Sequence, residues 1–324
     1  MRQPNITTKK NLIICMTPLQ VLLAVRIIEQ RPQETFVAIM ITYFNNEKYR
    51  YYFEKLKSLC VTAHFFPILA TKPLPRVLAL YQLKCLVNTY NKQTFNSCFI
   101  ASIDNTFAQL VASQANYHFL ETFDDGTANL NYQGTYYQNQ QPNLISRIIK
   151  HTLGIKLNTQ VIRKLSQRHH TIYRNQKNIT NNINVLLLAP EIENKKNDFT
   201  MPKKTINIFL GQPIIDLGLS PSQIITLCTQ YKIDYYFPHP REKNTIDGLT
   251  YINTPLIFED YILTLLTQKP ESEVVLYHFI STAALNVIAL PQVKAFSLYS
   301  PTLYRRFSGI YLLFQKNGMT LLEV

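Results

Sequence analysis

Short apolar segments alternate with amphipathic segments along most of the chain, and this alternation limits the folds that the chain can adopt. In the first half, apolar runs of strand length occupy residues 12–16, 36–42, 63–68, 97–101 and 117–123. Between them, as at residues 47–60, apolar side chains recur at helical spacing. A strand, a helix and a second strand in that order typically form a parallel βαβ unit. The pattern therefore predicts an α/β fold built on parallel sheets.

The second half repeats this alternation after a polar segment. Residues 191–204 are rich in Asn, Lys and Asp and have no apolar pattern, which indicates an interdomain linker. Beyond it, strand-like runs occupy residues 206–210, 233–237, 256–258, 273–279 and 293–297. Because a chain of 324 residues usually forms more than one core, we expect Rossmann-like domains over residues 1–190 and 205–300, facing a central ligand cleft. Residues 301–324 follow as a segment that could cross back to the first domain.

The chain is strongly basic, with a formal net charge of +13. Such a charge indicates a polyanionic partner, which could be nucleic acid, an anionic membrane or a phosphorylated substrate. The aromatic residues are spread through the predicted strands and form no RNA-binding signature, so nucleic acid is not expected. Many of the cationic residues lie in the segment 145–177. A solvated helical face explains most of them, and a surface that binds phosphates or anionic lipid is the alternative.

Cysteine usage and the N-terminal segment both indicate a cytoplasmic protein. The five cysteines are scattered and form no Cys-x-x-Cys pair, which argues against a disulfide framework or a zinc site. The apolar run 12–16 is broken by Thr17 and Pro18, and no signal-peptide cleavage site or membrane-length run is present. The glycine-rich motifs of dinucleotide and phosphate-loop enzymes are also absent, which argues against those two classes of enzyme.

Two acidic motifs follow predicted strands. In Phe123-Asp124-Asp125-Gly126, the adjacent carboxylates could bind a sugar hydroxyl or act as a base, or could simply form an Asp-Gly turn. The second motif begins at Gly211, where a Gly-x-Pro turn precedes Asp216. Asp216 is either a site residue or an ordinary acidic residue at a helix N-terminus.

Two further motifs carry a histidine and a pair of hydroxyl residues. Prolines on both sides of His239 end a strand, which places this histidine at the strand's carboxyl end, where α/β sheets bind ligands. A histidine there can give a proton to a leaving group, although a histidine in a loop is the simpler interpretation. Ser281 and Thr282 start a predicted helix and could bind phosphate through hydroxyl and N–H groups, or one of them could be an ordinary helix cap.

In their order and content, these motifs resemble the bacterial lipooligosaccharide sialyltransferases, glycosyltransferase family 52. The resemblance covers nearly the whole chain. Its matching segments are Asn45 with Glu47-Lys48-Tyr49 and Tyr51-Tyr52-Phe53, Thr122 to Thr127, Pro238-His239-Pro240-Arg241, Glu259-Asp260-Tyr261-Ile262-Leu263, and Phe279 with Ser281, Ala283, Ala284 and Leu285. It implies a GT-B-type fold of two Rossmann-like domains, with the N-terminal domain on the acceptor side and the C-terminal domain binding the CMP-sugar.

The resemblance also implies an activity: inverting, metal-independent transfer of sialic acid from CMP-sialic acid, a co-substrate, to a terminal galactose of lipooligosaccharide. His239 matches the general acid on the CMP phosphate. The implied donor-binding residues are Gly211, Pro240, Arg241, Glu259, Ser281 and Thr282, with Glu259 on the ribose hydroxyls and the hydroxyl pair on the phosphate. Asp124 and Gly126 are candidates on the acceptor side.

Asp216 is the best match for the base that deprotonates the galactose hydroxyl. In relatives the acidic residue follows Gly-x-Pro directly, whereas here Ile214 and Ile215 intervene. Asp125, and after it Asp124, is therefore the alternative base.

The expected surroundings of the enzyme follow from the same resemblance and from the charge. We expect a cytoplasmic protein held peripherally on the inner face of the bacterial inner membrane. A homodimer is plausible, because relatives can dimerise. A family relative that uses another nucleotide sugar is the alternative activity. A non-catalytic basic protein that binds lipid or nucleic acid is the alternative of a different class.

Overall fold

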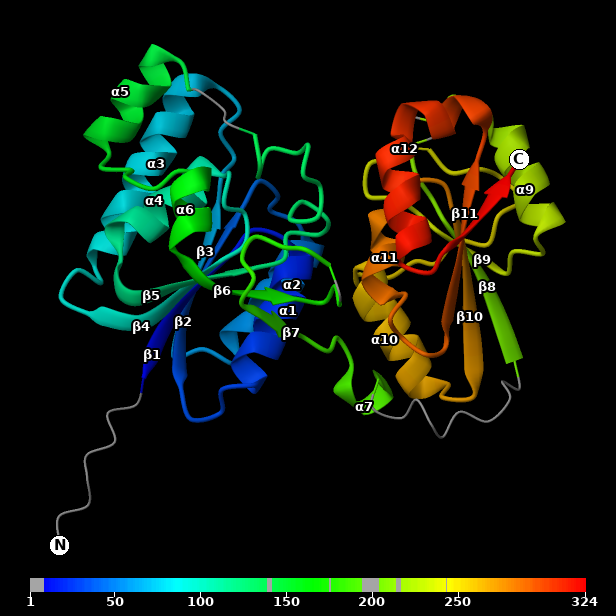
Figure 1. Ribbon diagram of the computed structural model, residues 1–324, viewed down its shortest axis with the longest axis horizontal. Helices are drawn as coiled ribbons and strands as arrows, with labels where there is room; N and C mark the ends of the chain where they lie inside the picture. The colour runs from blue at the N-terminus through cyan, green and yellow to red at the C-terminus, as the bar shows by residue number, and fades with distance from the viewer. Residues whose placement is uncertain (1–8, 139–141, 175, 194–203, 214–216, 243) are drawn as a thin grey trace, which may run out of the picture. The chain divides into compact units, whose positions relative to one another are not determined.

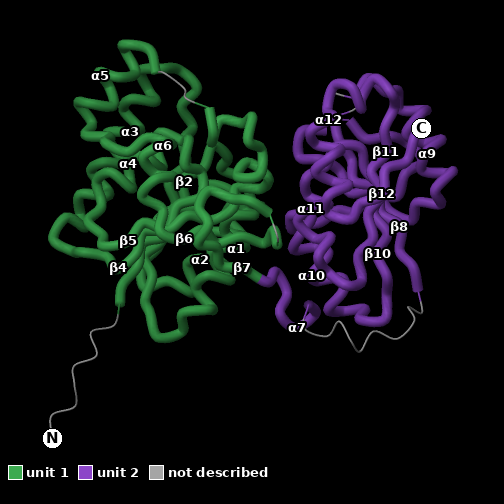
Figure 2. The backbone as a smooth tube through the Cα atoms, viewed as in Figure 1, with its two compact units in different colours: residues 1–186 green, residues 187–324 purple. Residues whose placement is uncertain are grey.

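The computed structural model describes residues 9–138, 142–174, 176–193, 204–213, 217–242 and 244–324 (Figure 1). The described residues form two compact units, which divide between Leu186 and Leu187 (Figure 2).

Unit 1 is a parallel sheet with helices connecting its strands. As far as the chain is described, the sheet has seven strands in the order β3-β2-β1-β4-β5-β6-β7, and neighbouring strands are parallel. The strands are β1 (Lys10–Cys15), β2 (Thr35–Thr42), β3 (Thr62–Pro67), β4 (Thr94–Ile100), β5 (Asn116–Phe123), β6 (Ser166–Thr171) and β7 (Ile183–Val185). The helices are α1 (Pro18–Glu29), α2 (Glu47–Lys57), α3 (Pro73–Asn88), α4 (Thr106–Gln114), α5 (Leu144–Thr152) and α6 (Thr159–Leu165).

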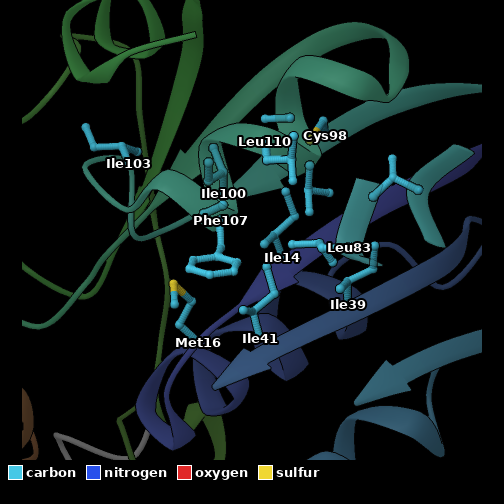
Figure 3. Packing of buried hydrophobic residues seen from close by; sticks show 14 of the residues in the cluster. Ile14, Met16, Ile39, Ile41, Leu83, Cys98, Ile100, Ile103, Phe107 and Leu110 are labelled. Carbon is cyan, nitrogen blue, oxygen red and sulfur yellow. The ribbon is translucent and has the colours of Figure 1, made fainter. Parts of the chain in front are cut away.

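The central strands of unit 1 are buried on both faces, which explains why they are apolar throughout. Leu12, Ile13 and Ile14 of β1 are at most 1% exposed. Helices α3 and α4 pack together, as do α1 and α2. Figure 3 shows part of the core on one face, which includes Ile14, Ile39 and Phe107. Each such side chain contributes roughly 1.5–3 kcal/mol by burial, so the continuous apolar runs secure a sheet covered by two helical layers.

Unit 2 is a second parallel α/β sheet. Within the described residues its strand order is β12-β11-β10-β8-β9, with all neighbours parallel. The strands are β8 (Lys204–Leu210), β9 (Tyr235–Phe237), β10 (Ser272–His278), β11 (Val293–Tyr299) and β12 (Thr320–Glu323). The helices are α7 (Pro190–Glu193), α9 (Pro221–Gln230), α10 (Phe258–Gln268), α11 (Thr282–Val287) and α12 (Pro301–Lys316). Two Rossmann-like units of parallel α/β type are therefore present.

The end of the chain belongs to unit 2. Helix α12 packs against β11 and β12, and β12 pairs with β11 from Phe296–Thr320 to Tyr299–Glu323. The physical reason is that residues 320–323 complete the sheet as its edge strand. The expected linker, residues 191–204, falls within unit 2, which begins at Leu187; its described ends belong to α7 (Pro190–Glu193) and to β8, which begins at Lys204. Residues 194–203 lie outside the described residues.

Two local predictions were wrong. His169 and His170 belong to strand β6 and are 0% exposed, although the basic composition around them indicated a solvated helical face. Both rings are buried because acidic partners from β5 and its following turn accompany them, as described below. The expected short strand over residues 256–258 is absent, since α10 begins at Phe258.

Candidate functional site

In unit 1, polar side chains converge where the strand order reverses, at the carboxyl ends of β1 and β4. Parallel α/β sheets bind ligands at such a point. Gln20, in the first turn of α1, is fully buried and accepts a hydrogen bond from the Met16 N–H (2.6 Å) through Oε1. Its Nε2 donates to Ser102 Oγ (2.8 Å) and to Asp125 Oδ1 (2.6 Å). Gln20 thus ties the ends of β1, β4 and β5 together.

Asp125 is held by several donors at this point. Besides the bond from Gln20, its Oδ2 accepts hydrogen bonds from Ser102 Oγ (3.0 Å) and from the Tyr136 hydroxyl (3.0 Å). Burial raises the pKa of Asp125; the three hydrogen bonds oppose this rise, and the charge of Asp104 adds to it. A carboxylate offers about four acceptor positions, so one remains for a substrate hydroxyl. Asp125 can therefore orient or deprotonate such a hydroxyl.

Asp124 has a different environment, although it is adjacent in sequence. It is 0% exposed, and its Oδ1 accepts hydrogen bonds from Asn129 Nδ2 (2.7 Å) and His169 Nε2 (3.0 Å). Its Oδ2 accepts from the Ile172 N–H (2.7 Å). These contacts join the end of β5 to β6, which favours a structural role for Asp124. Gly126 follows in the left-handed region (φ +53°), where glycine is unstrained.

A buried acid–base group lies further back in the same sheet. Glu121 Oε2 accepts a hydrogen bond from His170 Nε2 (2.7 Å) and lies 3.4 Å from Arg31 Nη2. Burial lowers the pKa of His170, against the opposing effect of Glu121. Burial acts to raise the pKa of Glu121, but His170, Arg31 and Ser97 together lower it. This group stabilises the packing of β5 and β6, and the histidine pair in the sequence was its one visible sign.

In unit 2, His239 follows β9 as predicted, and its loop is fixed by Glu242. Glu242 Oε1 accepts a hydrogen bond from the His239 backbone N–H (2.8 Å), and Oε2 accepts from the Tyr236 hydroxyl (3.1 Å). Burial raises the pKa of Glu242, partly offset by these two bonds. His239 Nδ1 accepts from the Arg241 N–H (3.0 Å), so Nε2 carries the proton of the neutral ring. The loop thus presents an imidazole N–H donor at a strand's carboxyl end.

Gly211 lies against the same group of residues. Its N–H donates to the Phe237 carbonyl (2.8 Å), at the ends of β8 and β9. A Cβ at this position would lie 2.6 Å from the Tyr236 hydroxyl oxygen and closer still to Glu242 Oε1. Gly211 is therefore required for the close approach of Glu242, which in turn holds His239. Pro240 and Arg241 follow in an exposed turn.

Ser281 and Thr282 lie at the end of the neighbouring strand, β10. Ser281 is the N-cap of α11, but its side chain makes no capping hydrogen bond. Its N–H donates to His278 Nδ1 (3.2 Å), and the Ile280 N–H donates to Gln212 Oε1 (2.8 Å), which connects the ends of β10 and β8. Burial lowers the pKa of His278 to about 3, so this ring is a neutral acceptor. A half-exposed hydroxyl pair beside two adjacent strand ends suits an anionic ligand.

Glu259 lies in the first turn of α10 and is 6% exposed. Its Oε1 accepts a hydrogen bond from Asn286 Nδ2 (2.6 Å), which links α10 to α11. Sequence reasoning missed Asn286, Gln20, Tyr136 and Glu242, because nothing in their local sequence marks them. Asp216, the predicted base, lies outside the described residues.

The larger cavity of unit 2 does not coincide with the predicted donor-binding residues. It has a volume of about 480 Å³ and is lined by residues of α9, the start of α12 and the chain end, with Phe279. None of the six predicted donor-binding residues lines this cavity as described. Across the described ranges, no three His, Cys, Asp or Glu side chains are grouped so that they could hold a metal ion.

Comparison of the sequence with known proteins gives a consistent family match. The model of Glycosyltransferase family 52 matches residues 33–300. The CMP-N-acetylneuraminate:β-galactoside α-2,3-sialyltransferase of Pasteurella multocida is 32% identical over 97% of this chain and 99% of its own length. The N-acetyllactosaminide α-2,3-sialyltransferase of Haemophilus influenzae is 32% identical over 88% and 90%, and that of Neisseria meningitidis is 29% identical over 96% and 85%.

Solved structures support the fold. A UDP-N-acetylglucosamine 2-epimerase aligns with a TM-score of 0.52 over 98% of this chain and 84% of that chain, at 10% identity. A UDP-glucosyltransferase from Polygonum tinctorium aligns with a TM-score of 0.50 over 90% and 80%, at 13% identity. At these identities the likeness concerns the fold alone. The predicted GT-B-type architecture of two Rossmann-like domains is confirmed.

Proposed function

Because the chain belongs to glycosyltransferase family 52, we propose that it transfers sialic acid from CMP-sialic acid to the galactose of a β-galactoside in α-2,3 linkage. The donor, the acceptor and the linkage are those in the names of the similar bacterial enzymes. Terminal galactose on lipooligosaccharide is the acceptor that the motif resemblance implies.

The observation that carries the proposal is the position of His239. It follows β9 directly, its backbone is fixed by Glu242, and Nδ1 accepts from the Arg241 N–H. In the neutral ring the proton is therefore on Nε2. A CMP leaving group develops negative charge on one phosphate, and an imidazole donor stabilises that charge and supplies the proton.

The reaction is one inverting displacement. The galactose hydroxyl oxygen forms a bond to the anomeric carbon of sialic acid while the bond from that carbon to the phosphate oxygen breaks. The hydroxyl proton passes to a carboxylate, and the Nε2–H of His239 donates to the departing phosphate oxygen as negative charge develops on it. A carboxylate base also suits the oxocarbenium-like transition state.

The remaining donor contacts come from neighbouring strand ends of unit 2. Ser281 and Thr282 bind the phosphate through their hydroxyls, since the Ser281 side chain makes no capping bond. Glu259, oriented by Asn286, binds the ribose hydroxyls. The Gly211 and Pro240–Arg241 segments form the surrounding loops.

Two carboxylates compete for the role of base. Asp216 is the one that the motif resemblance implies. Asp125 is the one that the described geometry supports, because it is half-buried at the sheet's switch point, keeps one acceptor position, and has a raised pKa. In either case the proton acceptor is a carboxylate and His239 is the acid.

The proposed catalysis needs no metal ion, because His239 and the donors at the start of α11 neutralise the phosphate. We place the enzyme at an anionic membrane surface. Helix α5 exposes Leu144, Ile145 and Ile148 beside cationic residues, and the net charge is +13. No described helix is long and apolar enough to cross a membrane.

Transfer to a labelled lactoside in the presence of EDTA tests the proposal. The expected product is α-2,3-sialyllactoside, identified by a linkage-specific sialidase, with CMP released in equal amount. Parallel reactions with UDP-galactose and UDP-N-acetylglucosamine test the alternative that another nucleotide sugar is the donor. Transfer from one of these donors, and none from CMP-sialic acid, would overturn the donor assignment.

A further inference from the structure

Unit 1 contains a cavity of about 400 Å³ that none of the proposed catalytic or donor-binding roles uses. It lies among the loop after β4, helix α4, and the segment from α5 to α6. Four of its lining residues are basic: Arg147, Lys150, His151 and Lys156. Its volume falls within the range of small-molecule sites.

The cationic side of the cavity is held in place by the fold. Lys150 is half-buried, and its Nζ donates to Gln109 Oε1 (3.0 Å). Gln109 is 2% exposed and its Nε2 donates to the Ile103 carbonyl (2.9 Å). Burial lowers the pKa of Lys150. The ammonium group is therefore fixed at the cavity wall by a buried amide.

The other polar lining groups suit a sugar. Gln109, Asn158, Thr159 and Gln160 supply amides and a hydroxyl. Such groups bind ring hydroxyls, whereas Arg147, Lys150 and Lys156 bind phosphate or carboxylate groups. The cavity also contains one acid, Asp104, which accepts a hydrogen bond from Thr135 Oγ1 (2.6 Å). Arg147, Lys150 and Lys156 thus outnumber the one carboxylate of the lining.

The cavity adjoins the carboxylate that we place on the acceptor side. Asp104 is two residues after Ser102, whose hydroxyl donates to Asp125 Oδ2 (3.0 Å). Thr135 donates to Asp104 Oδ2 and the adjacent Tyr136 donates to Asp125 Oδ2, so one short segment contacts both carboxylates. A saccharide whose terminal galactose lies at Asp125 can extend its next residues toward the cavity.

We propose that this cavity is an acceptor subsite that binds a phosphate- or carboxylate-bearing sugar of the acceptor oligosaccharide, beyond the terminal galactose. This inference rests on the proposed transfer to a galactoside. A saccharide is the occupant rather than a lipid headgroup, because amides and a hydroxyl surround the cations. The subsite lowers the KM of anionic acceptors without contacting the reacting galactose.

The test compares soluble acceptors, so that membrane binding plays no part. The acceptors are a fully deacylated, galactose-terminated lipooligosaccharide saccharide, the same saccharide dephosphorylated with aqueous HF, and methyl β-lactoside. The variant is Arg147→Gln/Lys156→Gln. The control, Lys164→Gln/Arg168→Gln, removes the same charge from exposed residues outside the cavity lining.

The cavity variant is expected to raise the KM for the phosphorylated saccharide by about 5–20-fold, since two charge-assisted contacts are lost. Its KM for methyl β-lactoside should change by less than about twofold, as should all values for the control. A smaller effect on the dephosphorylated saccharide assigns the site to phosphate, and an equal effect assigns it to carboxylate.

Three results would overturn the subsite. One is an unchanged KM for both saccharides. Another is an equal rise for methyl β-lactoside. The third is a loss confined to binding of anionic vesicles, which would assign the cations to lipid headgroups. Absence of transfer to any acceptor by the wild-type enzyme would instead refute the proposed function itself.

Discussion

Substitution of Gly211 by alanine tests the contact that fixes the histidine loop. The new Cβ would lie 2.6 Å from the Tyr236 hydroxyl oxygen and 2.7 Å from Tyr236 Cε1, closer than real Cβ contacts come, and nearer still to Glu242 Oε1. Tyr236 is 1% exposed and stacks on Phe209 with ring centroids 5.7 Å apart, so its ring has little room to move. The carboxylate of Glu242 must therefore be displaced.

The magnitude follows from two losses. Overpacking costs about 1–3 kcal/mol, and each of the two hydrogen bonds to Glu242 contributes about 0.5–1.5 kcal/mol. We expect Gly211→Ala to lower the free energy of unfolding by about 2–6 kcal/mol and the Tm by about 5–20 °C. Because the His239 N–H loses its acceptor, sialyl transfer should fall by about 10–100-fold.

The assay is thermal unfolding together with initial transfer rates below the Tm. The control is Gly309→Ala in α12, where an added Cβ meets nothing within 4 Å. Replacement of a helical glycine should leave stability unchanged or raise it by about 0.5–1 kcal/mol. If Gly211→Ala matched this control in Tm and in rate, the close approach of Gly211 to Glu242 would be refuted.

Three other predictions concern the base, the acid stability and the membrane. Asp216→Asn and Asp125→Asn should differ in transfer rate, and the variant that loses about 10²–10⁴-fold at constant Tm identifies the base. If Asp125 is the base, the transfer rate of the wild-type enzyme should rise with pH through the raised pKa of Asp125. His278 has a pKa of about 3 in the folded state against an ordinary 6.5, so its contribution to stability is complete above pH 6.5 and is lost as pH falls toward 3. Lowering the pH from 7.5 to 5 should therefore reduce the free energy of unfolding by about 2 kcal/mol through this residue. Urea unfolding of His278→Gln should no longer show this pH dependence. The protein should sediment with anionic vesicles at low salt and be released at high salt. Absence of binding at low salt would contradict the proposed attachment to an anionic membrane.

The ends of strands could be predicted from the sequence where apolar runs and prolines mark them. The apolar runs of β1 and β2 and the prolines around His239 place strand ends by local sterics alone, and His239 lies where they indicate. The end of the chain could not be placed, because residues 320–323 form an edge strand whose pairing with β11 is long-range.

The polar groups around the candidate site could be predicted only in part. Asp125 was a candidate from its motif, but its partner Gln20 lies 105 residues earlier and has no local signal. The basic composition around His169 and His170 indicated solvent exposure. Their acidic partners Asp124 and Glu121 lie 45 and 49 residues away, so only the tertiary structure shows that both rings are buried.

The most direct test of the central claim is the rate of sialyl transfer from CMP-sialic acid to a lactoside by the His239→Asn variant, with EDTA present. Asparagine can keep a hydrogen bond to the Arg241 N–H, so the loop and the Tm should be retained. The predicted result is a folded enzyme whose kcat is lower by about 10²–10⁴-fold than that of an active wild type. A folded variant that transfers sialic acid at the wild-type rate would contradict the role of His239 and with it the proposed mechanism.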